Sequence, residues 1–202
     1  YVIDQKIITL PLFKKFLVDE YFLVPVLALR YLPCIPHLQK KLSFISSYNS
    51  TSNILVKAEY LRTIRNFRYP KTINHFLEEE LNNATNVFLR KELINAIGYT
   101  NQINSVDILL DYFHKHKNEF LKNVDLSLQL INAFLQLARS KSYRTLYELY
   151  FLHTNHIVKS KIIEALATGG SCSIPLLEAM YRTETNEALR EEVYPHIFDS
   201  QA

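Results

Sequence analysis

Apolar residues recur along this chain in a five-residue pattern that returns about every 34 residues. The pattern has two apolar positions, a variable position, a small residue and another apolar residue, as in Leu93–Ile97 and Leu130–Phe134. A period in this range is typical of stacked supersecondary units, because one unit cannot bury its apolar face alone. In the three clear copies the fourth position is Ala96, Ala133 or Ala165. In the two looser copies it is Thr63 or His196, and in one degenerate copy it is Ala28.

Each repeat predicts two helices joined by a short polar turn, because its apolar residues follow one another at spacings of three and four. In the unit that starts near Leu89, Gly98 and Asn101–Asn104 are expected to end the first helix. Ser105 is expected to cap the second helix. Only three glycines occur in 202 residues, so the turns that many short strands need are missing. The sequence therefore predicts an all-α fold, and the repeat predicts an α-solenoid.

Residues 1–50 differ from the rest, because prolines divide their apolar pattern into short pieces. We expect an N-terminal helical capping region there, which can include a degenerate repeat, and a repeat array over residues 51–202 that ends in a partial repeat. Ser43–Asn53 is rich in serine and asparagine and predicts a longer loop. The four prolines are Pro11, Pro25, Pro33 and Pro36.

An aliphatic residue followed by a basic one opens the first helix of most repeats, and Leu126-Ser127 departs from this rule. The pairs are Val56-Lys57, Leu89-Arg90, Val158-Lys159 and Leu189-Arg190. With the alanine-aliphatic pair that follows, the pattern resembles HEAT-like repeats of the short kind found in phycobilin lyases, over roughly residues 52–200. The resemblance implies a right-handed superhelix of antiparallel helix pairs whose second helices line a concave binding face. Tetratricopeptide units have a similar period, but their aromatic and glycine signature is absent.

If second helices line the concave face, the positions just beside their buried stripe should face a ligand. Asp107 and Asp111 are one helical turn apart, so both carboxylates project to the same side. The mainly acidic set suits a basic or mixed peptide and repels phosphate, although a solvated surface with no partner explains it equally well. The predicted binding residues are Asn74, Glu78, Asp107, Asp111, Arg144 and Glu148.

A basic ridge, Arg62, Arg65 and Arg68, competes with this acidic set. It can contact phosphates or an acidic partner. We favour the alternative that the arginine stems cover apolar surface and their guanidinium groups pair with carboxylates such as Glu59. The basic residues that open the first helices are likewise predicted to be structural.

Charge, histidines and cysteines count against several further functions. The 23 basic and 20 acidic residues leave a net charge of +3, too small to imply a nucleic-acid or membrane partner. His114 and His116 point to different sides of a helix, so no metal site is predicted, and the sequence indicates no cofactor and no catalytic motif. Cys34 and Cys172 are expected to be buried free thiols.

Localisation stays open from the sequence. The longest apolar run, Tyr21–Leu29, is too short to span a bilayer. Two cysteines in different repeats fit a reducing compartment and favour the cytoplasm. Because the chain starts at Tyr1, a signal or membrane anchor could precede it.

The sequence favours a non-enzymatic scaffold that binds a protein or peptide on the concave face of the array. The alternative is a nucleic-acid-binding protein similar to the HEAT-like DNA glycosylases, in which Asp107 or Asp111 would be the catalytic residue. The absence of tryptophan and the acidic set count against it. HEAT-like chromophore lyases share the repeat, but nothing in this sequence singles out a tetrapyrrole site.

Overall fold

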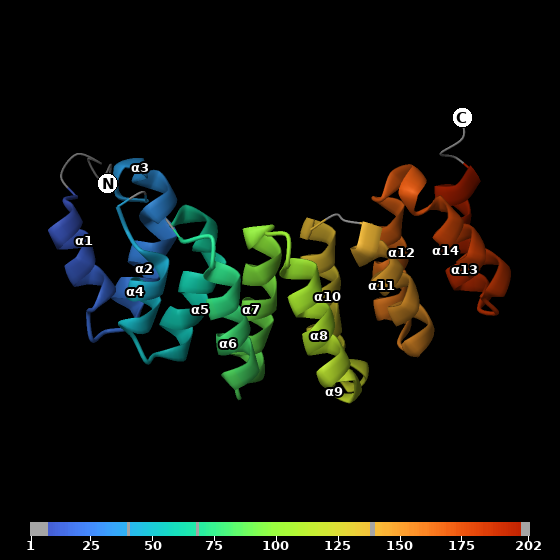
Figure 1. Cartoon of the computed structure of the whole chain (residues 1–202), viewed down its shortest axis with the longest axis horizontal. Helices are drawn as coiled ribbons and strands as arrows, with labels where there is room; N and C mark the ends of the chain where they lie inside the picture. Colours follow the sequence, from blue (N-terminus) through green and yellow to red (C-terminus); the bar gives the residue numbers. More distant parts are fainter. Residues whose placement is uncertain (1–7, 40, 68, 138–139, 199–202) are drawn as a thin grey trace. The chain divides into compact units, whose positions relative to one another are not determined.

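The computed structural model describes residues 8–39, 41–67, 69–137 and 140–198, and within these ranges the chain consists of helices and contains no strand (Figure 1). This confirms the predicted all-α class. The chain divides into two compact units, unit 1 (residues 1–100) and unit 2 (residues 101–202). The predicted boundary between cap and array, at residue 50, falls inside unit 1 and stays a prediction. No helix in the described ranges is long and apolar enough to cross a membrane.

Unit 1 is built from helices that pack on their neighbours in the chain. Helix α1 packs on α2, α2 on α5, α5 on α7 and α6 on α7. Its elements are α1 (Leu10–Leu17), α2 (Leu23–Tyr31), the 3₁₀ turn η1 (Leu32–Cys34), α3 (Pro36–Gln39), α4 (Phe44–Asn49), α5 (Ile54–Arg62), η2 (Ile64–Asn66), α6 (Ile73–Asn83) and α7 (Val87–Thr100).

Unit 2 repeats this organisation. Helix α10 packs on α12 and α12 on α14, while α11 packs on α12 and α13 on α14. We call α5, α7, α10, α12 and α14 the first helices, and α6, α8, α11 and α13 the second helices. The elements of unit 2 are α8 (Ser105–Lys115), α9 (Lys117–Lys122), α10 (Val124–Leu137), α11 (Ser140–Leu152), α12 (His156–Ala167), η3 (Gly170–Cys172), α13 (Ile174–Thr183) and α14 (Glu187–Phe198).

The repeated motif supplies the core of the first helices. Ala96, Ala133 and Ala165 are completely buried, and Thr63 is nearly so. The small side chains let the helices approach one another closely, while the adjoining aliphatic residues fill the space between them. Ala28 and His196, the degenerate and one looser copy, are only half-buried. The sequence pattern therefore identifies buried packing positions, most reliably in the copies that match the motif closely.

The predicted loop at Ser43–Asn53 is wrong over most of its length, because α4 occupies Phe44–Asn49. Phe44 and Tyr48 lie one helical turn apart, and both are fully buried. Their rings pack against each other and against the ring of Tyr60, with centroids 5.7 to 6.5 Å apart. Two buried aromatic side chains stabilise a helical turn that serine and asparagine disfavour by propensity.

The expected end of the first helix at Gly98 is also wrong. Gly98 is buried inside α7, which continues to Thr100. The chain turns at Asn101, whose φ of 47° is in the left-handed region that asparagine tolerates at helix ends. Ser105 is the first residue of α8 rather than its cap, and its hydroxyl accepts a hydrogen bond from the Gln102 N–H at 3.2 Å.

The cysteine prediction is wrong in one respect. Cys34 and Cys172 are free thiols, as expected, but both are exposed. Each lies in a short 3₁₀ turn beside a helix rather than on a buried helical stripe, so periodicity gave no information about its burial.

Candidate functional site

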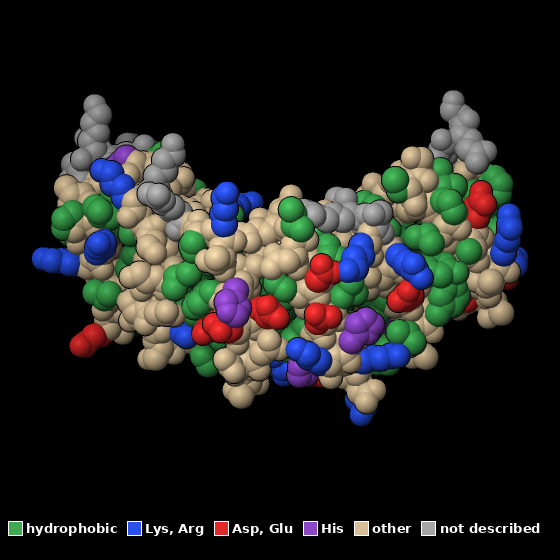
Figure 2. Space-filling model, viewed as in Figure 1, with side chains coloured by type: hydrophobic (Ala, Val, Ile, Leu, Met, Phe, Trp, Pro, Cys, Tyr) green, Lys and Arg blue, Asp and Glu red, His purple; other side chains and the backbone are tan. Residues whose placement is uncertain are grey.

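The charged residues predicted on second helices are brought together in unit 2. Asp107 and Asp111 on α8 are exposed, and so are Arg144 and Glu148 on α11, which contacts α8. Figure 2 shows acidic and basic side chains interspersed over these two helices. In unit 1, Glu78 on α6 is half-exposed. We call the α8 and α11 residues the second-helix stripe.

The second-helix stripe is less acidic than its sequence suggests. Lys141 Nζ pairs with Asp107 Oδ1, and Arg144 Nε lies 3.5 Å from Glu148 Oε1. Asp111 has no hydrogen bond or ion pair with the described residues. Exposed pairs of this kind are weak and leave the side chains available to a partner. The stripe is therefore a mixed, highly solvated surface in which one carboxylate, that of Asp111, has no cation partner among the described residues.

Asn74 does not belong to any exposed surface, so its predicted exposure is wrong. Its side chain is almost completely buried at the start of α6, and its Oδ1 accepts a hydrogen bond from Thr100 Oγ1 at 2.7 Å. Helix α6 packs on α7, and this bond joins the two helices. The repeat alignment could not show this, because it gives a position on a helix and not the residues facing it.

The predicted basic ridge separates into different surroundings. Arg62 Nε donates to Glu92 Oε1 at 2.9 Å, and Arg62 Nη1 lies 3.6 Å from Glu59 Oε2. The hydrogen bond to Glu92 is the main cause that raises the pKa of Arg62. The guanidinium carbon of Arg65 lies 5.8 Å from the ring centroid of Tyr99. Arg68 lies outside the described residues.

A row of alternating charges includes Arg62 and extends across three helices of unit 1. Glu59, nearly buried on α5, accepts from Arg30 Nε of α2 at 3.2 Å, and Arg62 pairs with Glu92 on α7. Every charge in this row thus has an opposite neighbour. The pairing of Arg62 with Glu59 that we favoured from the sequence is present, and the row joins helices.

Lys57 lies in a half-buried polar cluster of unit 1. Its Nζ is 4.5 Å from the ring centroid of Tyr48 and 3.8 Å from Glu80 Oε2. The Tyr48 hydroxyl donates to the same carboxylate oxygen at 3.0 Å. Burial, together with the Glu80 carboxylate, raises the pKa of Tyr48, so the phenol stays protonated. The cluster joins α4, α5 and α6.

The same cluster occurs in unit 2, built on α11, α12 and the residue after α13. Lys159 Nζ is 4.5 Å from the ring centroid of Tyr150 and donates to Glu184 Oε2 at 3.1 Å, and the Tyr150 hydroxyl donates to that oxygen too. Burial alone would raise the pKa of Glu184. Hydrogen bonds from Tyr150, from the Asn186 N–H and from Lys159 outweigh it and hold the pKa at about 2.

Ser127 stands where other repeats have a basic residue that opens the first helix. A neutral pair, Ser127 and His153, takes the place of the cation there. The Ser127 hydroxyl donates to the Phe120 carbonyl at 2.7 Å, so its oxygen accepts from His153 Nε2 at 3.0 Å. Burial lowers the pKa of His153, which keeps the ring neutral. Ser127 and His153 are buried. Like the two half-buried charged clusters, this pair borders none of the three surface hollows described below, and each of the three groups joins neighbouring helices.

Sequence reasoning identified the basic members of these clusters and missed their tyrosines and glutamates. A usable signal exists, since a tyrosine precedes the basic residue by nine positions in three repeats. The three pairs are Tyr48 and Lys57, Tyr150 and Lys159, and Tyr181 and Arg190.

A hollow of about 650 Å³ lies over three successive first helices of unit 2. We call it the first-helix groove. The exposed side chain of Ile157 and the half-exposed Leu128 form its apolar part. Its polar part includes the Lys161–Glu164 ion pair. Lining residues are Leu128 and Asn132 of α10, Ile157, Lys161 and Glu164 of α12, and Glu192 and His196 of α14.

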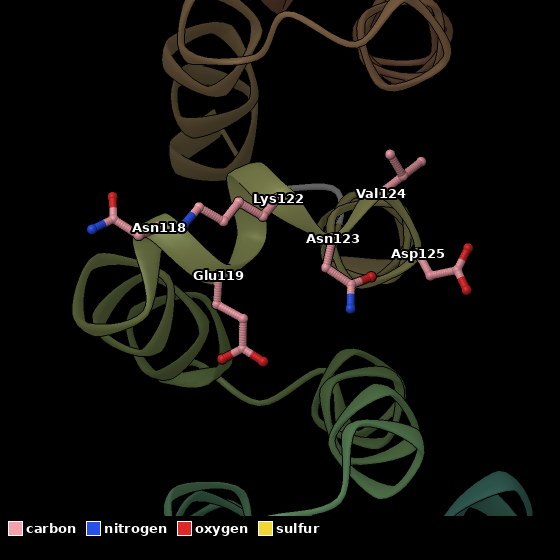
Figure 3. A pocket seen from close by; sticks show the side chains of 6 residues that line it. All are labelled: Asn118, Glu119, Lys122, Asn123, Val124 and Asp125. Carbon is pink, nitrogen blue, oxygen red and sulfur yellow. The ribbon is translucent and has the colours of Figure 1, made fainter.

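Two other hollows lack converging chemistry. One of about 680 Å³ is lined by Asn118, Glu119 and the four residues 122–125 around the turn from α9 to α10. Figure 3 shows their side chains pointing in different directions. Asn123 Oδ1 accepts from the Leu126 N–H at 3.1 Å and so caps α10. The third, about 890 Å³ in unit 1, is an open hollow bordered by the exposed Lys41 and Lys71.

Within the described residues, no three histidine, cysteine, aspartate or glutamate side chains are placed to hold a metal ion. No model of a known protein family matches the chain, and no curated protein matches it significantly.

Proposed function

We propose that this chain is a non-enzymatic scaffold, a right-handed solenoid of antiparallel HEAT-like helix pairs, that binds a segment of a partner protein in the first-helix groove of unit 2. The observation that supports it best is a continuous hollow over α10, α12 and α14. One side chain from each of three repeats can then contact a single ligand, as in other repeat proteins.

Helix packing supports the stacked arrangement. The first helices of unit 2 contact one another in chain order, and these contacts are more extensive than the contact between the second helices α8 and α11. A stack of helix pairs curves toward the layer whose helices approach one another more closely. The first helices would therefore line the concave side of unit 2, whereas the resemblance to HEAT-like repeats implied the second helices.

The groove chemistry specifies the kind of partner. Ile157 is 63% exposed at the edge of the hollow, and an apolar side chain of the ligand would cover it. Glu192 is half-buried in the groove and makes no hydrogen bond or ion pair with the described residues. A ligand with one aliphatic or aromatic residue and one lysine or arginine would match both. The proposed partner is thus a basic, partly apolar peptide segment.

Peptides selected from a displayed random library test this proposal. We expect selected peptides to combine a basic and an apolar residue, and to bind Ile157→Glu and Glu192→Lys about tenfold or more weakly than the unmodified chain. Ile103→Glu is the matched control, because Ile103 is 84% exposed and lies outside the groove. Affinities are measured by titration calorimetry.

The second-helix stripe is tested with the same peptides. If Asp111→Lys weakens binding while Ile157→Glu has no effect, the stripe is the binding site and the groove is not. A library that yields no binder contradicts the scaffold. Salt-dependent binding of duplex DNA by the unmodified chain would instead support the nucleic-acid alternative.

A further inference from the structure

The end of unit 2 contains an incomplete copy of the Tyr–Lys–Glu cluster. The guanidinium carbon of Arg190, on α14, lies 5.8 Å from the ring centroid of Tyr181 on α13. In the two complete clusters, a glutamate in α6 or directly after α13 pairs with the cation and accepts from the phenol. No described carboxylate lies within ion-pair distance of Arg190. Among the described residues, this copy has the ring and the cation and lacks the acid.

Two exposed aromatic side chains surround this incomplete cluster. Tyr194 is 49% exposed and Phe198 47%, and their ring centroids are 4.6 Å apart. The residues at the position of Tyr194 in earlier repeats, Leu61, Ile131 and Ile163, are all buried. The face formed by Tyr181, Arg190, Tyr194 and Phe198, the C-terminal face, is therefore one that the next helix pair covers in an internal repeat.

This face differs from the first-helix groove, although α14 contributes to both. Arg190, Tyr194 and Phe198 are spaced four residues apart and share one side of the helix. Leu189, Val193 and Ile197 form the adjacent buried side, and Glu192 and His196 line the groove. A ligand in the groove and a partner on the C-terminal face would contact different sides of α14.

The start of unit 1 has the complementary features. Helix α1 packs on α2, and at the other end of the chain α13 packs on α14. Leu23, Leu27 and Tyr31 of α2 are 39 to 54% exposed. Asp19, in the turn between α1 and α2, accepts from the Tyr21 N–H at 2.9 Å, the same bond that Glu184 makes with the N–H two residues later at 2.9 Å. We call α1, the turn and α2 the N-terminal face.

We propose that copies of this chain associate head to tail, with the N-terminal face of one copy packed on the C-terminal face of another. Asp19 of one copy would pair with Arg190 of the next and accept a hydrogen bond from its Tyr181, completing the third cluster. Both faces expose large apolar side chains, and Asp19 of the N-terminal face is opposite in charge to Arg190 of the C-terminal face. Because the two faces are different surfaces, the contact is heterologous and produces open chains of molecules rather than closed dimers unless the geometry forms a ring.

Sedimentation equilibrium over a range of concentrations tests the association. We expect the average mass to rise above the 23.7 kDa of one chain as concentration increases. Asp19→Arg and Arg190→Glu should each be monomeric, because each places like charges opposite one another. An equimolar mixture of the two variants restores opposite charges at every contact and should associate, as should the double variant. Tyr194→Glu should also be monomeric, and Ile103→Glu should behave like the unmodified chain.

Three outcomes would overturn the proposal. The first is an unmodified chain that stays monomeric at every concentration. The second is association that survives both single charge reversals. The third is failure of the mixture and of the double variant to associate, because rescue depends on direct pairing of residues 19 and 190. Circular dichroism of each variant confirms that the helices are intact.

Discussion

The Tyr–Lys–Glu clusters of unit 1 and unit 2 have the same parts and differ in their exposure to water. In both, the lysine Nζ lies 4.5 Å from the tyrosine ring centroid. The Lys57–Glu80 distance is 3.8 Å and the Glu80 side chain is 29% exposed, whereas the Lys159–Glu184 distance is 3.1 Å and the Glu184 side chain is 7% exposed. A shared sequence pattern thus produces two charge pairs of unequal exposure. We expect the less exposed pair to be the stronger, because water screens a charge pair.

The Ser127–His153 pair extends this comparison to a neutral case. Ser127 occupies the repeat position of Lys57 and Lys159, and His153 follows it at nearly the spacing of the two glutamates. A hydrogen bond between neutral groups joins the helices there as the charged clusters do elsewhere. The repeat position of Lys57, Ser127 and Lys159 therefore requires a satisfied polar contact and not a positive charge. This supports a structural role for the basic residues that open the first helices.

Removing the lysine from each cluster should give the largest difference in stability between the two clusters. Lys159→Met is expected to lower the free energy of unfolding by about 3 kcal/mol, because the buried Glu184 carboxylate loses its cation. Lys57→Met should cost only about 1 kcal/mol, since water reaches Glu80. Urea denaturation at neutral pH, followed by circular dichroism, measures both.

Lys161→Met is the control for these two variants, because the Lys161–Glu164 pair is on the surface. It should change the free energy of unfolding by no more than about 0.5 kcal/mol. Equal losses for Lys57→Met and Lys159→Met would show that burial does not distinguish the two clusters.

Acid should weaken the unit 2 cluster in a defined pH range. The folded-state pKa of Glu184 is about 2, against an ordinary value of 4.5, so the folded chain releases this proton more readily than the unfolded chain. The resulting stability is present above pH 4.5 and is lost as the pH falls toward 2. Glu184→Gln should therefore cost about 2 kcal/mol at pH 7 and almost nothing near pH 2. Urea denaturation across this range, with Glu164→Gln as the exposed control, measures the difference. A cost independent of pH would contradict the assignment.

The all-α class and the buried positions of the repeated motif could be predicted from the sequence, because both depend on local periodicity. Ala96, Ala133 and Ala165 are buried where the motif places them. Periodicity failed where a few buried aromatic contacts decide the structure. Phe44 and Tyr48 form α4 in a segment whose composition predicts a loop.

The candidate site was harder to predict, because a site depends on which helices face each other. Asp107 and Asp111 are exposed as expected, yet the alignment gave no indication that Lys141 pairs with Asp107. The first-helix groove was missed since Ile157 looks like an ordinary apolar residue at the start of a helix. Only contacts among α10, α12 and α14 define that hollow.

The neutral pair should show the smallest effect, and one that occurs at a higher pH. Burial lowers the pKa of His153 below 6.5, so the unfolded chain binds this proton at a higher pH than the folded chain. The stability due to the neutral ring is present above pH 6.5 and declines as the pH falls toward the folded-state pKa. Between pH 7 and 5 the unmodified chain should lose about 1 kcal/mol from this residue, and His153→Gln, which can still bond to Ser127, should not. His75→Gln is the exposed control and should lose stability in parallel with the unmodified chain. If His153→Gln follows the unmodified chain across this range, the ring does not stay neutral between the two helices, and the likeness to the charged clusters fails at this position.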